Sequence, residues 1–119
     1  MKKTLVLGAS ENETRYSNMA VKRLLQHGHE VIALGKRKGR CHGVEIHNTP
    51  LPIEQLDTIT LYLNPRNQAN YYDYILSLHP QRIIFNPGTE NPELWEKATA
   101  QGIACVGACT LVLLNTNQY

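Results

Sequence analysis

The sequence predicts an α/β protein, in which a doubly wound, mostly parallel sheet of five to six strands carries helices on both faces. Short apolar segments alternate with longer amphipathic segments along the whole chain. This alternation is typical of parallel strands buried on both faces and joined by helical crossovers. There is no internal repeat, low-complexity tract or composition boundary in the 119 residues. We therefore expect one domain that spans residues 1–119.

The first half of the chain contains three predicted strands and one predicted helix. These are a strand at Thr4–Gly8, a helix at Tyr16–His27, a strand at Glu30–Leu34 and a short strand at Val44–His47. In the helix, Met19, Ala20, Leu24 and Leu25 recur at helical spacing, and Gly28 follows as a suitable helix-ending residue. The stretch GKRKGRCHG, rich in glycine and cations, is expected to be a loop.

The second half continues the same alternation. The predicted strands are Thr58–Leu63, Arg82–Phe85 and Ile103–Val106, the predicted helices are Asn67–Leu78 and Pro92–Gln101, and Leu111–Leu114 adds a last helical turn. Tyr71, Tyr74, Ile75 and Leu78 share one helix face, which predicts packing against the sheet. Tyr72 is left on the exposed side, where it is available for a protein contact. Right-handed crossovers make this order a Rossmann-like sheet.

The composition is that of an ordinary soluble domain. Apolar residues make up 42% and charged residues 18% of the chain, and the formal net charge is only +2. This charge is too small to indicate a nucleic-acid-binding protein, and no basic aromatic stripe is present. No apolar run approaches the ~18 residues that a membrane span needs, and Met1-Lys2-Lys3 leads directly into a strand. We expect neither membrane insertion nor export, and hence a cytoplasmic protein.

Cysteine and histidine spacing argues against a metal site. Cys41, Cys105 and Cys109 are odd in number and form no CxxC pair, so we expect reduced thiols. None of the five histidines has the spacing of zinc ligands. His27 and His29 flank Gly28 and are expected to cap helix carbonyls or face water. Cys109 is interpreted as a core or cleft-wall residue rather than an activated nucleophile.

The candidate site follows from the predicted fold. In an open parallel sheet, ligands bind outside the carboxyl ends of the strands, where the strand order reverses. The segments that follow the predicted strands are GASENETRYSN, GKRKG, NPRNQ and NPGTEN. Each segment is polar and contains glycine or proline, and the first three contain cations. We therefore look for a polar ligand at this edge of the sheet.

The first of these loops has the features of a phosphate site. Gly8 permits a tight turn, and Ala9 and Ser10 are small enough for a phosphate to approach the start of the next helix. Arg15 supplies a charged, planar donor group that suits phosphate. The alternative is a tight turn with a solvated arginine, because the pattern lacks the further glycines of the dinucleotide motif.

The second loop indicates which nucleotide is favoured. Proteins that prefer NAD normally place an acidic residue here to hold the ribose 2′-hydroxyl. This chain instead has Lys36, Arg37 and Lys38 between two glycines. Cations at this place suit a phosphorylated ribose, either the 2′-phosphate of NADP or the 3′-phosphate of coenzyme A (CoA). The alternative is a basic loop that faces only solvent.

The segment KTLVLGASENETRYSNMAVKRLLQHGHEVIAL resembles the opening of the small CoA-binding domain family. These are single Rossmann-like domains similar to the N-terminal domain of the succinyl-CoA synthetase alpha subunit. The matching positions are Gly8, Ala9, Ser10, Arg15, Ser17, His27 and Gly28. HGVEIHNTPLPI resembles the short strand that follows, and Cys109 falls near a cysteine common at the family's C-terminal end. The chain departs from the family at Gly-Lys-Arg, where Asn-Pro is common, and at Asn86-Pro87-Gly88, where a Gln-Leu-Gly pattern is usual.

The resemblance implies a binding site for CoA or an acyl-CoA. It implies that Gly8, Ala9, Ser10 and Arg15 border the phosphates, with Ser17 completing the matched motif. It further implies that Lys36 and Lys38 neutralise the 3′-phosphate, and that Asn64-Pro65 and Pro87-Gly88 line the rest of the cleft.

We interpret the protein as a non-catalytic nucleotide-binding module. The related synthetase subunit needs a second domain with a phosphorylated histidine, for which 119 residues leave no room. Two alternatives stay open: a small NADP-dependent oxidoreductase, and a Rossmann-like module that acts through a protein partner and binds nucleotide weakly. A protein partner or a homo-oligomer is compatible with each interpretation.

Overall fold

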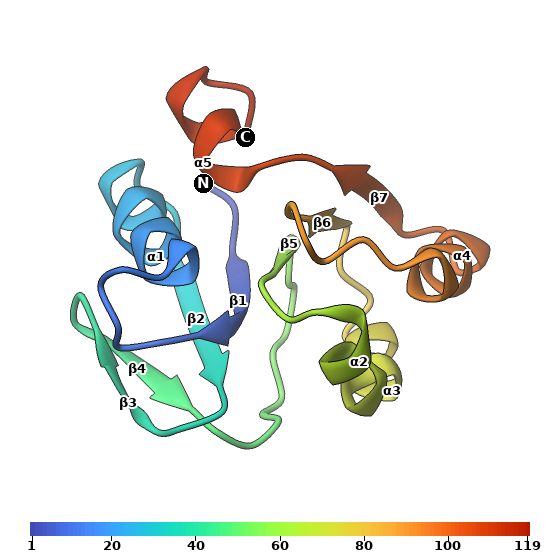
Figure 1. Ribbon diagram of the computed structural model, residues 1–119. Helices are drawn as coiled ribbons and strands as arrows, with labels where there is room; N and C mark the ends of the chain where they lie inside the picture. The colour runs from blue at the N-terminus through green and yellow to red at the C-terminus, as the bar shows by residue number, and fades with distance from the viewer.

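The computed structural model describes all residues, 1–119, and contains one seven-stranded sheet in the order β3-β4-β2-β1-β5-β6-β7 (Figure 1). The strands are β1 (Thr4–Ala9), β2 (Val31–Gly35), β3 (Gly39–Cys41), β4 (Val44–His47), β5 (Thr58–Leu61), β6 (Arg82–Phe85) and β7 (Ala104–Gly107). Every neighbouring pair is parallel except β3 and β4, which are antiparallel. The predicted doubly wound, Rossmann-like α/β class is confirmed.

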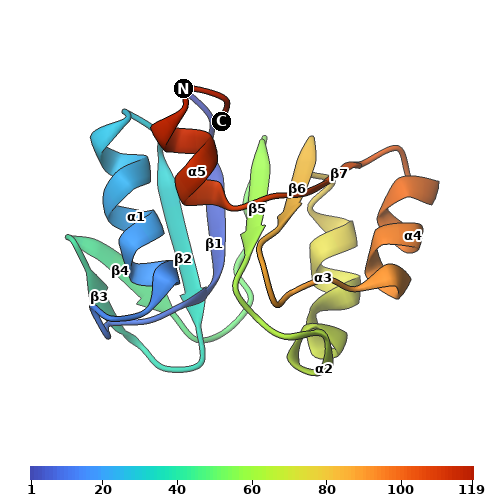
Figure 2. The same cartoon turned by 45° about the horizontal axis from the view of Figure 1, so that its top comes forward.

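Helices cover both faces of the sheet (Figure 2). They are α1 (Tyr16–Gln26), α2 (Pro65–Gln68), α3 (Tyr72–Ser77), α4 (Pro92–Ala100) and α5 (Thr110–Asn115). The core between the sheet and α1 and α5 contains Val6, Val21, Leu24, Ala33, Ile46 and Leu114. The core on the opposite face, under α3 and α4, contains Leu5, Leu7, Ile59, Leu61, Ile75, Ile83, Phe85, Leu94 and Ala98.

Strand β1 shows why the apolar runs form central strands. Side chains alternate between the faces of a strand, so Leu5 and Leu7 enter one core while Val6 enters the other. All three side chains are completely buried. Each contributes roughly 1.5–3 kcal/mol relative to an exposed position, and a charged residue at any of them would have no solvent-facing side.

The predicted count of five to six strands is one too low. The additional strand is β3, Gly39–Cys41, within the glycine- and cation-rich stretch that was expected to be a loop. Its three residues pair with β4 in an antiparallel hairpin and carry no apolar alternation. Pairing with β4 and burial of Cys41 stabilise β3. Because both contacts involve residues outside the segment, its own sequence does not predict a strand.

The predicted helix Asn67–Leu78 is divided into α2, a 3-10 turn at Ala69–Tyr71 and α3. It also starts earlier, because Asn64 caps it and Pro65 occupies the first turn. Tyr74 and Ile75 pack on the core as predicted. The prediction of an exposed Tyr72 is wrong: its ring is half-buried, and its hydroxyl accepts a hydrogen bond from Asn91 Nδ2 at 2.7 Å.

None of the helices has both the length and the apolar character that crossing a bilayer requires.

Candidate functional site

The strand order reverses between β1 and β5. The connection from β1 through α1 leads to β2 on one side, whereas the chain after β5 leads through α3 to β6 on the other side. Figure 2 shows the two connections diverging from these adjacent strands. Such a reversal opens a crevice at the carboxyl ends of the strands. The loops predicted to bind a ligand all begin at this edge.

Two glycines let the β1–α1 loop lie directly on the strand ends. Gly8 has φ +104°, and a Cβ atom there would lie 2.9 Å from the backbone carbon of Tyr62. A Cβ on Gly35 would lie well within 3.0 Å of the Ala9 carbonyl oxygen. The backbone at Gly8 and Ala9 therefore lies so close to Tyr62 and Gly35 that neither glycine can be replaced by a larger residue without a shift of the backbone.

Hydrogen bonds fold the loop into a fixed shape. Ser10 Oγ accepts from the backbone N–H of Asn12 at 3.0 Å, and Asn12 Oδ1 accepts from the backbone N–H of Thr14 at 3.0 Å. Asn18 Nδ2 donates to the carbonyl oxygen of Ser10 at 2.9 Å, which ties the loop to the first turn of α1. The sequence analysis missed Asn18, although a polar residue on the buried face of a helix is a usable signal.

The amino end of α1 has several groups that attract anions. Arg15 is its N-cap, with an extended backbone and no side-chain capping bond, and the first turn contains no acidic residue. The first N–H groups of a helix lack intrahelical partners, and the dipole adds partial positive charge. The Arg15 side chain is exposed, whereas Ser17 is 4% exposed and lies beneath the loop. A ligand can thus reach Arg15 and the loop, but not the Ser17 side chain directly.

The turn after β2 presents unpaired cations. Lys36, Arg37 and Lys38 are exposed, and none of the three pairs with a carboxylate. These three side chains are therefore available to an anionic ligand. They lie on the β2 side of the β1–α1 loop, because β2 neighbours β1 in the sheet.

The loops after β5 and β6 form the other side of the crevice. Asn64 Oδ1 accepts from the backbone N–H of Asn67 at 2.9 Å, so this oxygen is occupied as a helix cap. Pro65 begins α2, while Pro87 and Gly88 are exposed in the loop after β6. The predicted residues are thus divided, with Lys36 and Lys38 on one side of the β1–α1 loop and these four residues on the other.

A buried polar network supports the crevice from beneath, and the sequence analysis did not predict it. Asn86 Nδ2 donates to Thr60 Oγ1 at 2.7 Å and to the Leu61 carbonyl at 2.8 Å. Asn86 Oδ1 accepts from the backbone N–H of Thr110 at 2.8 Å. One side chain therefore joins β5, β6 and the start of α5. All three hydrogen bonds are buried away from solvent. Loss of the Asn86 side chain would therefore leave buried polar groups without a hydrogen-bond partner.

Tyr62 follows β5 directly, lies beside Gly8 and packs against the core on the α1 side of the sheet. Its hydroxyl is buried without a hydrogen-bond partner, and burial raises the pKa of this phenol to about 12. The hydroxyl therefore stays protonated and neutral at physiological pH. Tyr62 acts as a packed wall, and its position depends on the absence of a side chain at Gly8.

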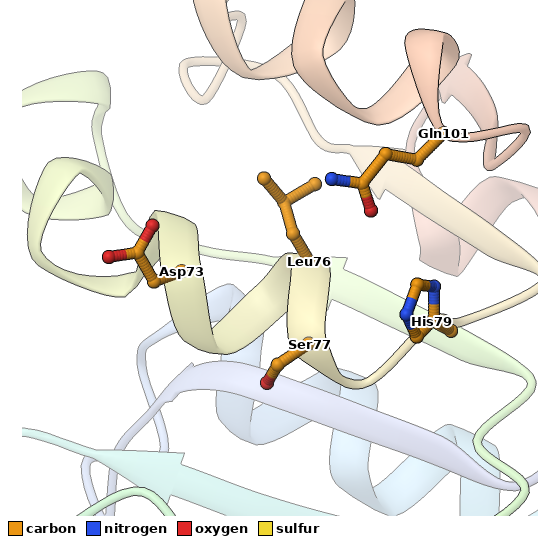
Figure 3. Close-up of a pocket in the computed structure, with 5 residues that line it drawn as sticks. All are labelled: Asp73, Leu76, Ser77, His79 and Gln101. Atoms are coloured by element: carbon orange, nitrogen blue, oxygen red, sulfur yellow. The ribbon is translucent and has the colours of Figure 1, made fainter.

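A hollow beside α3 lies away from these loops, and Figure 3 shows the side chains that line it. Its volume is about 590 Å³, and its lining residues are Asp73, Leu76, Ser77, His79 and Gln101. The first three lie on α3, His79 follows α3 and Gln101 follows α4, and Arg82 then begins β6. The lining contains no lysine or arginine and has Asp73 at its edge. It is therefore a poor match for a phosphorylated ligand.

Histidine and cysteine positions complete the comparison with the sequence. No three His, Cys, Asp or Glu side chains are grouped as metal ligands. Cys41 is buried, and Cys109 is half-buried at the start of α5. As predicted, His29 caps a helix carbonyl, because its backbone N–H donates to the Leu24 carbonyl oxygen at 3.0 Å. Its Nδ1 accepts from the backbone N–H of Lys2 at 2.9 Å, and burial lowers its pKa.

The fold and the site together define a small Rossmann-like α/β domain with polar, cation-bearing loops at the carboxyl ends of its strands. A family model described as a CoA binding domain matches residues 2–115, and the chain belongs to this family. A search of curated proteins gave no match.

Three solved structures show how widely this fold is shared. A crystal structure of an uncharacterized protein is 52% identical, with a TM-score of 0.98 over 100% of this chain and 98% of the other. A hypothetical protein from Pyrococcus horikoshii OT3 is 25% identical, with a TM-score of 0.85 over 93% and 80%. Acetyl-coenzyme A synthetase 1 of Ca. Korarchaeum cryptofilum, in complex with phosphate and ADP, is 15% identical, with a TM-score of 0.70 over 89% of this chain and 25% of the synthetase. This last likeness concerns the fold alone.

Proposed function

We propose that the protein binds coenzyme A or an acyl-CoA through its phosphates and acts as a non-catalytic nucleotide-binding module. The pyrophosphate would lie against the β1–α1 loop at Gly8, Ala9 and Ser10, with the Arg15 guanidinium beside it. Membership of the CoA binding domain family supports this ligand class. The module would present or sequester the nucleotide, and the chemistry would belong to another protein.

The observation that carries the proposal is the construction of the β1–α1 loop. A glycine that tolerates no side chain, a helix start without acidic residues and an exposed arginine occur together at the reversal of strand order. Backbone N–H groups at a helix start bind phosphate oxygens, and arginine adds a charged double donor. Each feature by itself occurs in many loops, but their combination at this edge suits a diphosphate.

The remaining predicted residues would contact the two ends of the ligand. Lys36 and Lys38 would neutralise the 3′-phosphate, since both are exposed and unpaired beside the loop. Asn64 and Pro65, with Pro87 and Gly88, would line the opposite side of the crevice. Ser17 would support the loop from beneath rather than contact the ligand.

Isothermal titration with CoA and with 3′-dephospho-CoA tests this assignment. We expect CoA to bind roughly fivefold more tightly, because two exposed cation–phosphate contacts contribute about 0.5 kcal/mol each. Added salt should narrow the difference, since exposed charges are screened. Equal affinity at low salt would remove the role of Lys36 and Lys38, and the absence of binding by both compounds would contradict the proposal itself.

NADP is the second candidate ligand, and the cationic turn after β2 is the observation that favours it. The same lysines could receive a 2′-phosphate instead of a 3′-phosphate. Fluorescence titration with NADPH separates the two ligands. A CoA-binding module should leave NADPH fluorescence unchanged, even at NADPH concentrations equal to those at which CoA saturates the protein. An oxidoreductase should instead bind NADPH and reject CoA.

A further inference from the structure

Glu11 makes an unusual contact across the candidate site. Its carboxylate lies flat against Gly39, so that a Cβ atom on this glycine would be only 2.6 Å from both carboxylate oxygens. The backbone N–H of Arg40 donates to Glu11 Oε2 at 3.1 Å. The side chain thus reaches from the β1–α1 loop to the edge strand β3, where only a glycine leaves room for it.

This contact marks a position that accepts an anion. The Arg40 N–H belongs to β3, which is the edge of the sheet, so no neighbouring strand accepts it. Three exposed cations, residues 36–38, precede Gly39 directly in the chain, and Arg40 follows it with its guanidinium donating to the Gly43 carbonyl oxygen at 3.3 Å. None of them forms an ion pair with Glu11. The carboxylate is therefore held by a backbone donor and a glycine surface, both of which would also suit a phosphate oxygen.

Glu13 provides an internal comparison. It lies on the same exposed loop and has the same charge, but no hydrogen bond to its carboxylate is present. A change at Glu13 therefore alters the net charge of the loop without disturbing the contact with β3.

We propose that Glu11 is a specificity-determining residue of the nucleotide site. Its carboxylate occupies the place between the β1–α1 loop and the cationic turn that a phosphate on the ligand's ribose would take. A phosphorylated ribose must displace the carboxylate, because the two anions repel. An unphosphorylated ribose can instead donate a hydroxyl to it, as riboses do to acidic residues after the second strand of dinucleotide sites. This inference rests on the proposed function.

The test compares Glu11→Gln with Glu13→Gln. Each variant is titrated calorimetrically with CoA and with 3′-dephospho-CoA at low salt, and the ratio of the two affinities is determined. We expect the ratio in favour of CoA to rise roughly threefold in Glu11→Gln, which removes one exposed charge repulsion at the phosphate position. In Glu13→Gln the ratio should change by less than about 1.5-fold, because this carboxylate makes no hydrogen bond to β3 and an exposed charge is screened.

Folding is checked by thermal melting, and Glu11→Asp replaces the glutamine variant if that variant does not fold. The aspartate keeps the charge but is one methylene shorter, so it should also raise the ratio, by less. An equal ratio in the Glu11 and Glu13 variants, with CoA still bound, would overturn the role of Glu11 and leave the proposed function standing. If the parent and the Glu11 variants all fail to bind CoA, the proposed function and the role of Glu11 are both overturned.

Discussion

Replacement of Arg15 by alanine is expected to weaken CoA binding by one to two orders of magnitude and to leave the fold intact. The Arg15 side chain is exposed and makes no capping bond, so its removal should cost little stability. A charge-assisted contact to a phosphate is worth about 1.5–3 kcal/mol, which corresponds to roughly one to two decades of affinity. The measurement is calorimetric titration with CoA, with circular dichroism to check the fold.

Two further variants separate a specific contact from a general effect of charge. Lys36→Ala should weaken binding less than Arg15→Ala and show a stronger dependence on salt, because an exposed ammonium is flexible and well hydrated. Lys22→Ala removes a cation from the exposed side of the same helix and should have almost no effect. If a folded Arg15→Ala protein binds CoA like the parent, the β1–α1 loop is not the phosphate site.

The second large effect is expected at Gly35, where alanine should destabilise the protein by about 3 kcal/mol. The new Cβ would overlap the backbone carbonyl oxygen of Ala9, and both atoms are fixed by the backbones of two paired inner strands. Neither can rotate away, so β2 or the β1–α1 loop must shift. We also expect CoA affinity to fall, since the shifted loop is the proposed phosphate site. Thermal or urea unfolding gives the stability change.

Gly107 offers a matched control at the end of another parallel strand. It closes β7 as Gly35 closes β2, but a Cβ there would meet no atom within 4 Å. Gly107→Ala should therefore change the free energy of unfolding by less than about 0.5 kcal/mol. Similar losses in the two variants would show that the contact with Ala9 is not the cause.

Most of the fold could be predicted because its central strands carry a strong local signal. Arg82–Phe85 is predicted to the residue, and the other central strands to within a few residues, since buried parallel strands are short apolar runs between turn residues. Strand β3 could not be predicted, because three residues that include a glycine and an arginine depend on β4 for their conformation. The break after α2 could not be predicted either, because the apolar residues of the tyrosine-rich segment keep helical spacing across it.

The site could be located from the sequence, but its internal contacts could not. The rule that ligands bind beyond parallel strands selects the loops that begin at Gly8 and Lys36. The contact of Glu11 with Gly39 and Arg40 joins residues far apart in the chain, and nothing in the local pattern of either segment indicates it. The residues that follow the second strand include no acidic group, and this absence was the reason to favour a phosphorylated ribose. The structure supplies such a group from the neighbouring loop.

The central claim is that the phosphates of CoA bind at the carboxyl ends of β1 and β2. Mapping of backbone amide shifts in isotope-labelled protein during a titration with CoA tests it most directly. The account predicts that the largest shifts occur at Ala9, Ser10 and Lys36–Lys38, and that saturation follows the calorimetric affinity. Largest shifts around Leu76, His79 and Gln101, at the hollow beside α3, would contradict it.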